Sequence, residues 1–152
     1  MDTVAKLVGR MEKAAEPILK LLPEYKAFQD LQKSLKLPSS TGGAEGGAKG
    51  DGVATQFSIG VNYWSGAHID DDNFFTILSC LSNDDKVHDE IMYYFCYPEY
   101  NLAIPMRSGD VLIFNPLKKH CCSNCKFDDS YIFSAYVSTK TVMTKGIEKL
   151  MS

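Results

Sequence analysis

The sequence predicts a single, mainly β domain, a sandwich or barrel, preceded by helices. Its 152 residues match the usual size of one domain and are enough to bury a core. Residues 2–36 place apolar side chains at helical spacing. From residue 53 onward, short β-prone segments alternate with turn signals, a pattern typical of sandwiches and barrels.

The helical part is expected to form two or three short helices that are broken near its prolines. Val4, Leu7 and Met11 form one apolar stripe at helical spacing. Pro17 and Pro23 stand where new helical turns can begin, because proline is tolerated in a first turn but disrupts a helix interior.

A glycine-rich stretch, PSSTGGAEGGAKGDG, follows the helices. It has almost nothing to bury, so we expect a flexible connection. A natural surface loop, a disordered insert and an engineered joint all fit this composition. The predicted organisation is one domain with helices in 1–37, the flexible loop in 38–52 and the β core in 53–152.

The β core is rich in aromatic and β-branched residues, which favour strands. Turn-forming residues, such as Ser108-Gly109-Asp110, separate the candidate strands. The strands are expected at 55–64, 74–81, 91–97, 101–106, 111–115 and 131–139, and a short helix is expected at 145–151.

Charge and cysteine content restrict the function. The net charge of −3 argues against a broad basic surface for nucleic acid. No apolar run approaches the ~20 residues that span a bilayer, so we expect no membrane partner. Five cysteines, an odd number, without a signal-peptide pattern favour a reducing intracellular compartment, either cytoplasm or nucleus. We expect a monomer.

The most informative motif is His68-Ile69-Asp70 together with His120. Alternate side chains of an extended segment share one face, so His68 and Asp70 can bind one ion while Ile69 packs behind them. His120, at the close of an apolar strand, is available as the third ligand. Two histidines and one carboxylate form the facial triad that holds non-haem Fe(II) and leaves positions open for other ligands.

The context of this motif resembles the Fe(II)/2-oxoglutarate dioxygenases of the double-stranded β-helix fold. A strand that runs into a small-residue bend, 63–67, precedes His68, and a turn, a strand and a second turn, 107–116, precede His120. The resemblance covers about residues 54–140 and is nearest to TET/JBP-like or prolyl-hydroxylase-like members. It implies a jelly-roll or cupin-like core with supporting helices, and His68, Asp70 and His120 as iron ligands.

The resemblance also implies an activity and a substrate class. Members of these groups hydroxylate a C–H bond with Fe(II) and 2-oxoglutarate, and ascorbate is a further candidate reductant. A TET/JBP-like protein would act on a methylated base flipped from duplex DNA, and a prolyl-hydroxylase-like protein on a protein side chain. A local basic patch for nucleic acid could come from Lys118, Lys119, Lys126, Lys140 and Lys145.

The cosubstrate site departs from the family pattern. The resemblance implies an Arg or Lys on the strand after the distal histidine, where it would pair with the far carboxylate of 2-oxoglutarate. That strand contains no Arg here. The candidate cosubstrate residues are therefore Arg107, Tyr136, Ser138 and Lys140, and plain surface charge is the alternative for Arg107 and Lys140. An unusual mode of 2-oxoglutarate binding, another reductant and loss of activity all stay open.

Three residues near the motif are candidates for substrate binding. Tyr63 and Trp64 lie close to His68 in the sequence and could stack on a substrate. Asp72 continues the face of Asp70 and could contact substrate or orient a ligand. The alternative for Asp72 is that it begins a solvated turn.

Two other classes of function remain open. Cys122-x-x-Cys125 has the spacing of a zinc knuckle, so a structural zinc protein is one alternative. A catalytically degenerate β-barrel that serves as an interaction module is the other, and the missing Arg supports it. His68 and His120 could also be ordinary core or surface histidines, as we expect of His88 in its polar loop.

Overall fold

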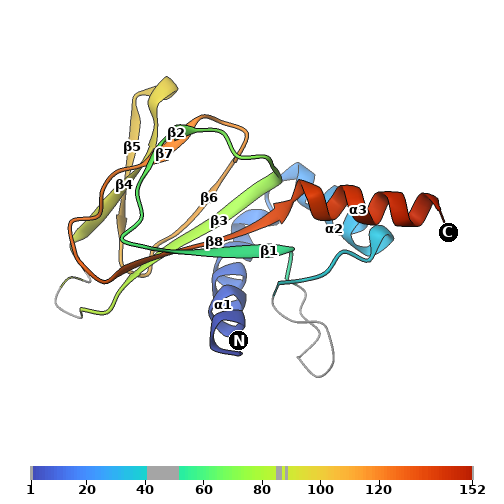
Figure 1. Cartoon of the computed structure of the whole chain (residues 1–152), viewed down its shortest axis with the longest axis horizontal. Coiled ribbons are helices and arrows are strands. Elements are labelled where there is room, and N and C mark those ends of the chain that lie inside the picture. Colours follow the sequence, from blue (N-terminus) through green and yellow to red (C-terminus); the bar gives the residue numbers. More distant parts are fainter. Residues whose placement is uncertain (1, 41–51, 85–86, 88, 152) are drawn as a thin grey trace.

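A computed structural model describes residues 2–40, 52–84, 87 and 89–151, and it contains two four-stranded antiparallel sheets with three helices in these ranges. Figure 1 shows how these elements are arranged. The helices are α1 (Asp2–Leu19), α2 (Pro23–Leu35) and α3 (Thr139–Leu150), and the short 3₁₀ turn is η2 (Pro98–Tyr100). The strands are β1 (Gln56–Val61), β2 (Ser65–His68), β3 (Asp72–Ser82), β4 (Ile91–Tyr97), β5 (Leu102–Arg107), β6 (Val111–Phe114), β7 (His120–Cys122) and β8 (Ser130–Ser138).

The strand order identifies the architecture. One sheet has the order β1-β8-β3-β6 and the other has the order β2-β7-β4-β5. Consecutive strands pass from one sheet to the other, except that β4 and β5 pair as neighbours in the same sheet. Two facing sheets linked in this way form the jelly-roll, or cupin-like, double-stranded β-helix. The predicted mainly β fold with N-terminal helices is therefore confirmed.

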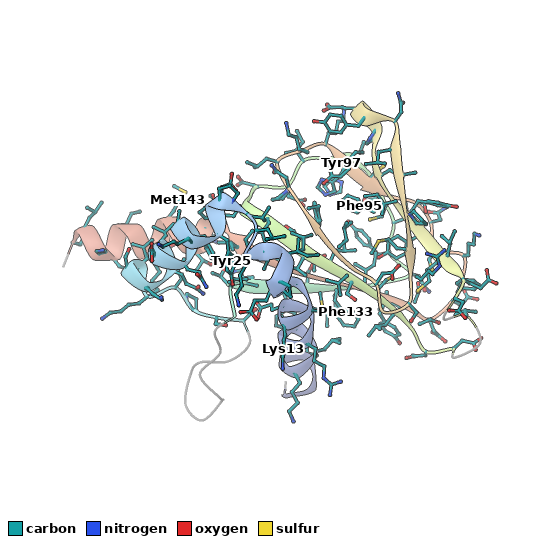
Figure 2. All side chains as sticks on the ribbon, turned by 180° about the vertical axis from the view of Figure 1, so that it is seen from behind. Lys13, Tyr25, Phe95, Tyr97, Phe133 and Met143 are labelled. Carbon is teal, nitrogen blue, oxygen red and sulfur yellow. The ribbon has the colours of Figure 1, made fainter. Side chains whose placement is uncertain are left out.

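The central strands β3 and β8 of the first sheet are largely buried on both faces. Their side chains alternate between two cores. Phe133, Ala135 and Val137 face the helices, whereas Ile132 packs in the core between the sheets. Figure 2 shows Phe133 beside α1, while Phe95 lies inside the barrel. This alternation leaves the inner face of β8 free to contribute to a site between the sheets.

The helices cover the outer face of this sheet. Phe28 of α2 is fully buried, and its ring contacts Phe74 at 4.7 Å and Phe75 at 6.1 Å. α2 begins at Pro23, as the sequence predicts, but α1 continues through Pro17 and ends at Leu19. Pro17 lies in the last turn of α1, and the helix ends two residues after it.

A buried hydrogen bond connects α1 to the entrance of β1. Glu12 is 7% exposed, and its Oε1 accepts a hydrogen bond from the backbone N–H of Ala54 at 2.7 Å. Glu12→Ala is expected to lower the free energy of unfolding by about 1–3 kcal/mol, because it leaves a buried N–H without its acceptor. Urea unfolding would measure this loss. Lys13→Ala, an exposed change on the same helix, should have little effect, and equal losses for both variants would contradict the prediction.

Several elements differ from the sequence-based prediction. The short strands β2 and β7 were not predicted, and α3 begins at Thr139, directly after β8, rather than at residue 145. β3 begins at Asp72, two residues earlier than expected, because a bulge between Asn73 and Thr76 extends its pairing with β8. Residues 41–51 of the predicted flexible loop, and His88, lie outside the described residues.

Phe74 is the residue that makes the bulge unusual. Its φ of 63° lies in the left-handed region, which costs a bulky residue roughly 1–2 kcal/mol. The contact of its ring with buried Phe28 offsets this cost. The bulge places Phe74 and Phe75 together on the helix side, and Thr76 and Leu78 remain on the inner side of the sheet.

None of the helices in the described ranges is both long enough and apolar enough to cross a membrane.

Candidate metal centre

The three predicted ligands meet at the edge of the sheet with the order β2-β7-β4-β5, near the strands β2 and β7. His68 ends β2 and is the register partner of His120, which opens β7. Asp70 follows β2 in the connection to β3, and its backbone N–H donates a hydrogen bond to the carbonyl of Pro116 at 3.0 Å. This bond connects the two segments that carry the ligands, so the backbone itself positions the carboxylate between the histidines.

Two details of the predicted geometry are wrong. His120 opens the short strand β7, whereas the prediction placed it at the close of the preceding apolar strand, which ends at Phe114. Ile69 is 59% exposed rather than packed behind the ligands. β2 ends at His68, so Ile69 belongs to a connecting segment that lies on the surface and not to a strand between two packed layers.

The ligand atoms are close enough to share one ion. Nε2 of His68 lies 3.3 Å from Oδ1 of Asp70, and Nε2 of His120 lies 3.3 Å from Oδ2 of the same carboxylate. The two imidazole centroids are 4.5 Å apart. Within the described part of the chain, this is the single group of three or more metal-ligating side chains whose ligand atoms all lie within 4.8 Å of one another.

Backbone carbonyls fix which ring nitrogen faces the carboxylate. Nδ1 of His68 lies 2.7 Å from the carbonyl of Gly66, and Nδ1 of His120 lies 2.8 Å from the carbonyl of Lys118. A carbonyl only accepts, so each Nδ1 carries a proton, and Nε2 is the ring nitrogen available to bind a metal ion. Lone pairs from two rings and a carboxylate then converge, and a cation is the group that satisfies all three.

Two phenyl rings enclose the imidazole of His120. Its side chain is 4% exposed, stacks on Phe95 at 5.3 Å and contacts Phe114 at 4.8 Å. A neutral imidazole bound to a metal ion keeps its apolar ring faces against the phenyl rings. The donor set and its setting therefore fit a divalent transition-metal ion.

The ligands open into a pocket of about 310 Å³ between the two sheets. Both sheets contribute to its wall, and no Lys or Arg is among the residues that line it. Its lining residues are Ser58, Ile59, Gly60, Tyr63, Ser65, His68, Asp70, Asp72, Thr76, Leu78, Phe95, Phe114, His120, Cys122, Ile132, Ser134 and Tyr136.

Three of the predicted cosubstrate and substrate residues line this pocket, namely Tyr63, Asp72 and Tyr136. Burial raises the pKa of Asp72 to about 6, and the nearby carboxylates of Asp70 and Asp71 contribute to the same shift. Asp72 pairs with Ser138 in the β3–β8 ladder. It therefore opens a strand, and the alternative of a solvated turn is wrong for this residue.

The structure does not bring the other four predicted residues to the pocket. Nε of Arg107 donates a hydrogen bond to the carbonyl of Asp89 at 3.2 Å, at the far end of the β4–β5 hairpin. Ser138 is buried outside the pocket, Lys140 is exposed on α3, and the Trp64 side chain is 64% exposed. The two cations proposed to pair with 2-oxoglutarate are thus surface charges, because hairpin pairing and the start of α3 direct them away from the pocket.

Sequence analysis missed several residues of the pocket wall. Phe95 and Phe114 were assigned only to strands, although they hold the ring of His120. Thr76 and Ser134 carry a clearer signal, because each is a hydroxyl residue flanked by apolar residues in a strand-forming segment. Such isolated hydroxyls indicate either a buried hydrogen bond or a polar site facing the strand.

The cysteines do not form a second metal site within the described residues. Cys122 is buried in the core between the sheets, and Cys125 packs against the same core. Burial raises the pKa of the Cys122 thiol to about 12. Zinc requires thiolates and usually four ligands, so the zinc-knuckle alternative has no support from this geometry.

Burial also predicts the reactivity of the thiols. Cys80 and Cys122 are expected to resist iodoacetamide at about pH 8, because burial raises the pKa of each to about 12 and the reagent needs a thiolate. The half-buried Cys121 and Cys125 should react first. Mass spectrometry of labelled peptides, before and after urea unfolding, would measure the order. Labelling of Cys80 at the rate of Cys125 in the folded protein would contradict this expectation.

Comparisons with known proteins add a distant structural likeness. The crystal structure of a Cupin 2 conserved barrel domain protein from Salinispora arenicola CNS-205 aligns with a TM-score of 0.40 and 14% identity, over 60% of this chain and 68% of that chain. No family model and no curated protein matches the sequence. The chain is a cupin-like double-stranded β-helix protein by its own strand order, and it carries a candidate His-Asp-His metal site.

Proposed function

We propose that this protein is a non-haem Fe(II)-dependent oxygenase that hydroxylates a C–H bond of a nucleobase or a protein side chain, with a 2-oxo acid as cosubstrate. The observation that carries the proposal is the convergence of His68, Asp70 and His120 at one end of a pocket between the sheets. Two histidines and one carboxylate with open space beside them match the donor set of such oxygenases.

The protein's own residues would orient the ligands and exclude water. The carbonyls of Gly66 and Lys118 hold the imidazole rings with Nε2 toward the site. Phe95 and Phe114 cover the ring of His120 and remove solvent from that side. A bound Fe(II) would supply the oxidation chemistry that side chains lack, and the protein would provide binding, orientation and electrostatics.

Pocket volume and location support a small cosubstrate. About 310 Å³ is at the lower end of the range for small-molecule sites. The family resemblance favours 2-oxoglutarate as this cosubstrate, with ascorbate as an additional reductant. Tyr63 and Tyr136 lie in the pocket wall, where they could contact a cosubstrate or the reacting group of a substrate.

The macromolecular substrate would reach the site at the exposed side of His68. Trp64 is exposed in the segment before β2, and Lys118 and Lys119 are exposed in the loop before His120. A tryptophan and two lysines could contact a base and a phosphate. The acidic total charge also fits a peptide substrate, so a panel of methylated oligonucleotides and peptides is the suitable assay.

The test uses anaerobic protein with Fe(II) and a 2-oxo acid. Bidentate chelation should give a weak visible charge-transfer band, and admission of O₂ should consume the 2-oxo acid even without substrate. Both signals should be absent in His120→Ala. Tight iron binding without any band would disfavour the oxygenase. Absence of both iron binding and band would favour the degenerate interaction module, which the lack of Lys and Arg in the pocket wall also fits.

A further inference from the structure

The charge of the pocket restricts what can bind beside the metal. Asp70 and Asp72 are the lining residues with ionisable carboxyl groups, and the lining contains no Lys or Arg. Asp70 and a divalent ion together carry one positive charge. The 2-oxo carboxylate of a ligand can pair with this positive charge. Asp72 adds no cation to the pocket, so a second ligand carboxylate would be buried without a cation to pair with it.

The wall opposite the second sheet offers hydroxyl groups instead of charge. Thr76 of β3 and Tyr136 of β8 are register partners, so the two residues lie side by side on the inner face of that sheet. Ser134 is the next pocket-lining residue of β8. The three side chains thus form a cluster, the hydroxyl wall, that can donate hydrogen bonds to an uncharged acceptor.

Thr76 gives independent evidence that this wall binds a ligand. The residue is 2% exposed, and its Oγ1 is buried without a hydrogen-bond partner. Most buried hydroxyls are paired, and an unpaired one costs stability. A ligand acceptor in the pocket would give this hydroxyl the partner that the protein does not provide.

We propose that the hydroxyl wall selects a monoanionic 2-oxo acid whose far end is uncharged and accepts hydrogen bonds, in preference to the dicarboxylate 2-oxoglutarate. The 2-oxo carboxylate end would face His68, Asp70 and His120. The far end would lie against Thr76 and Ser134. This inference rests on the proposed metal centre and specifies the class of its cosubstrate.

The test compares three probes of equal carbon backbone in anaerobic Fe(II) protein: 2-oxoglutarate, its 5-methyl ester and 2-oxopentanoate. Titration of the charge-transfer band gives a dissociation constant for each. The ester should bind at least tenfold more tightly than 2-oxoglutarate. Equal or tighter binding of 2-oxoglutarate would overturn the inference and leave the metal centre intact.

Two variants test the wall itself. Thr76→Val keeps the shape of the side chain and removes its hydroxyl. It should weaken binding of the ester by up to about tenfold. Binding of 2-oxopentanoate, which lacks the acceptor, should not change. Thr144→Val on exposed α3 is the matched control. Ser134→Lys adds a cation to the wall and should shift the preference at least tenfold toward 2-oxoglutarate. If both variants bound the three probes as the unmodified protein does, the proposed role of the hydroxyl wall would be overturned.

Metal binding is measured separately by Co(II) absorption, which needs no 2-oxo acid. Co(II) binding without a response to any of the three probes would overturn the inference alone. Failure of Co(II) binding in the unmodified protein would overturn the proposed function and, with it, the inference. Each variant is used only if its Co(II) affinity and its circular dichroism match those of the unmodified protein.

Discussion

Asp70→Asn is expected to weaken Co(II) or Fe(II) binding by at least about 100-fold. Both carboxylate oxygens of Asp70 face an imidazole Nε2 at 3.3 Å, and this residue contributes the only negative charge of the triad. Loss of outer partners alone costs metal sites about 10–100-fold, so loss of a direct charged ligand should cost at least as much. The asparagine amide keeps the shape and one neutral oxygen, which separates the effect of charge from that of packing.

Asp71→Asn provides the matched control. Asp71 is the exposed neighbour of the ligand, and its substitution removes the same charge from the same segment. Competition with a chromophoric chelator would measure both affinities. The assignment of Asp70 would be contradicted if the two variants lost equal affinity, because the effect would then come from the general charge of the segment and not from a ligand.

Phe28→Ala should produce a large loss of stability. Phe28 is fully buried between α2 and the outer face of the first sheet, where it contacts the rings of Phe74 and Phe75. Removing such a ring costs about 3–5 kcal/mol, because it loses apolar burial and leaves a cavity. Urea unfolding at equilibrium would measure the decrease in the free energy of unfolding.

The control for this prediction is Phe57→Ala. Phe57 lies on the edge strand β1 and is 40% exposed, so its loss should cost about 1 kcal/mol or less. A small loss for Phe28→Ala would mean that the helices contribute little to the domain. A large loss also has a consequence for the site: the bulge at Phe74, which contacts Phe28, should relax and change the position of Asp72.

Local patterns in the sequence were sufficient to predict most of the strands that form the core. β8 could be predicted because Phe133, Ala135 and Val137 alternate with residues that face the inner core. β4 matches its predicted range, 91–97, because aromatic and apolar residues continue to both of its ends. The candidate metal site could be predicted because its residue types are chemically specific, and two of the three are separated by a single residue.

Other features depend on contacts between distant segments. β2 and β7 contain only four and three residues. Neither strand is long enough to show an alternation of apolar and polar residues. The bulge at Phe74 depends on the register with β8, and the position of Arg107 depends on the pairing of β4 with β5. The sequence-based choice of Arg107 and Lys140 used their charge and their positions near the strands around His120. Neither property determines which side of a strand or helix a residue occupies.

The pocket wall is another feature that the sequence alone could not predict. The sequence shows Thr76 as one hydroxyl in an apolar strand, but only the fold shows that it is buried, unpartnered and next to Tyr136. The family resemblance implies a cation near the metal site, but the pocket lining contains no Lys or Arg. The missing Arg or Lys could be interpreted only after the pairing of β3 with β8 was known.

The most direct test of the metal centre is anomalous diffraction from crystals grown with Mn(II), at wavelengths on either side of the metal edge. The triad predicts one strong peak within bonding distance of Nε2 of His68, a carboxylate oxygen of Asp70 and Nε2 of His120. The same crystals of Asp70→Asn should lose it. A peak elsewhere, or a fully formed fold with no peak between these three side chains, would contradict the account.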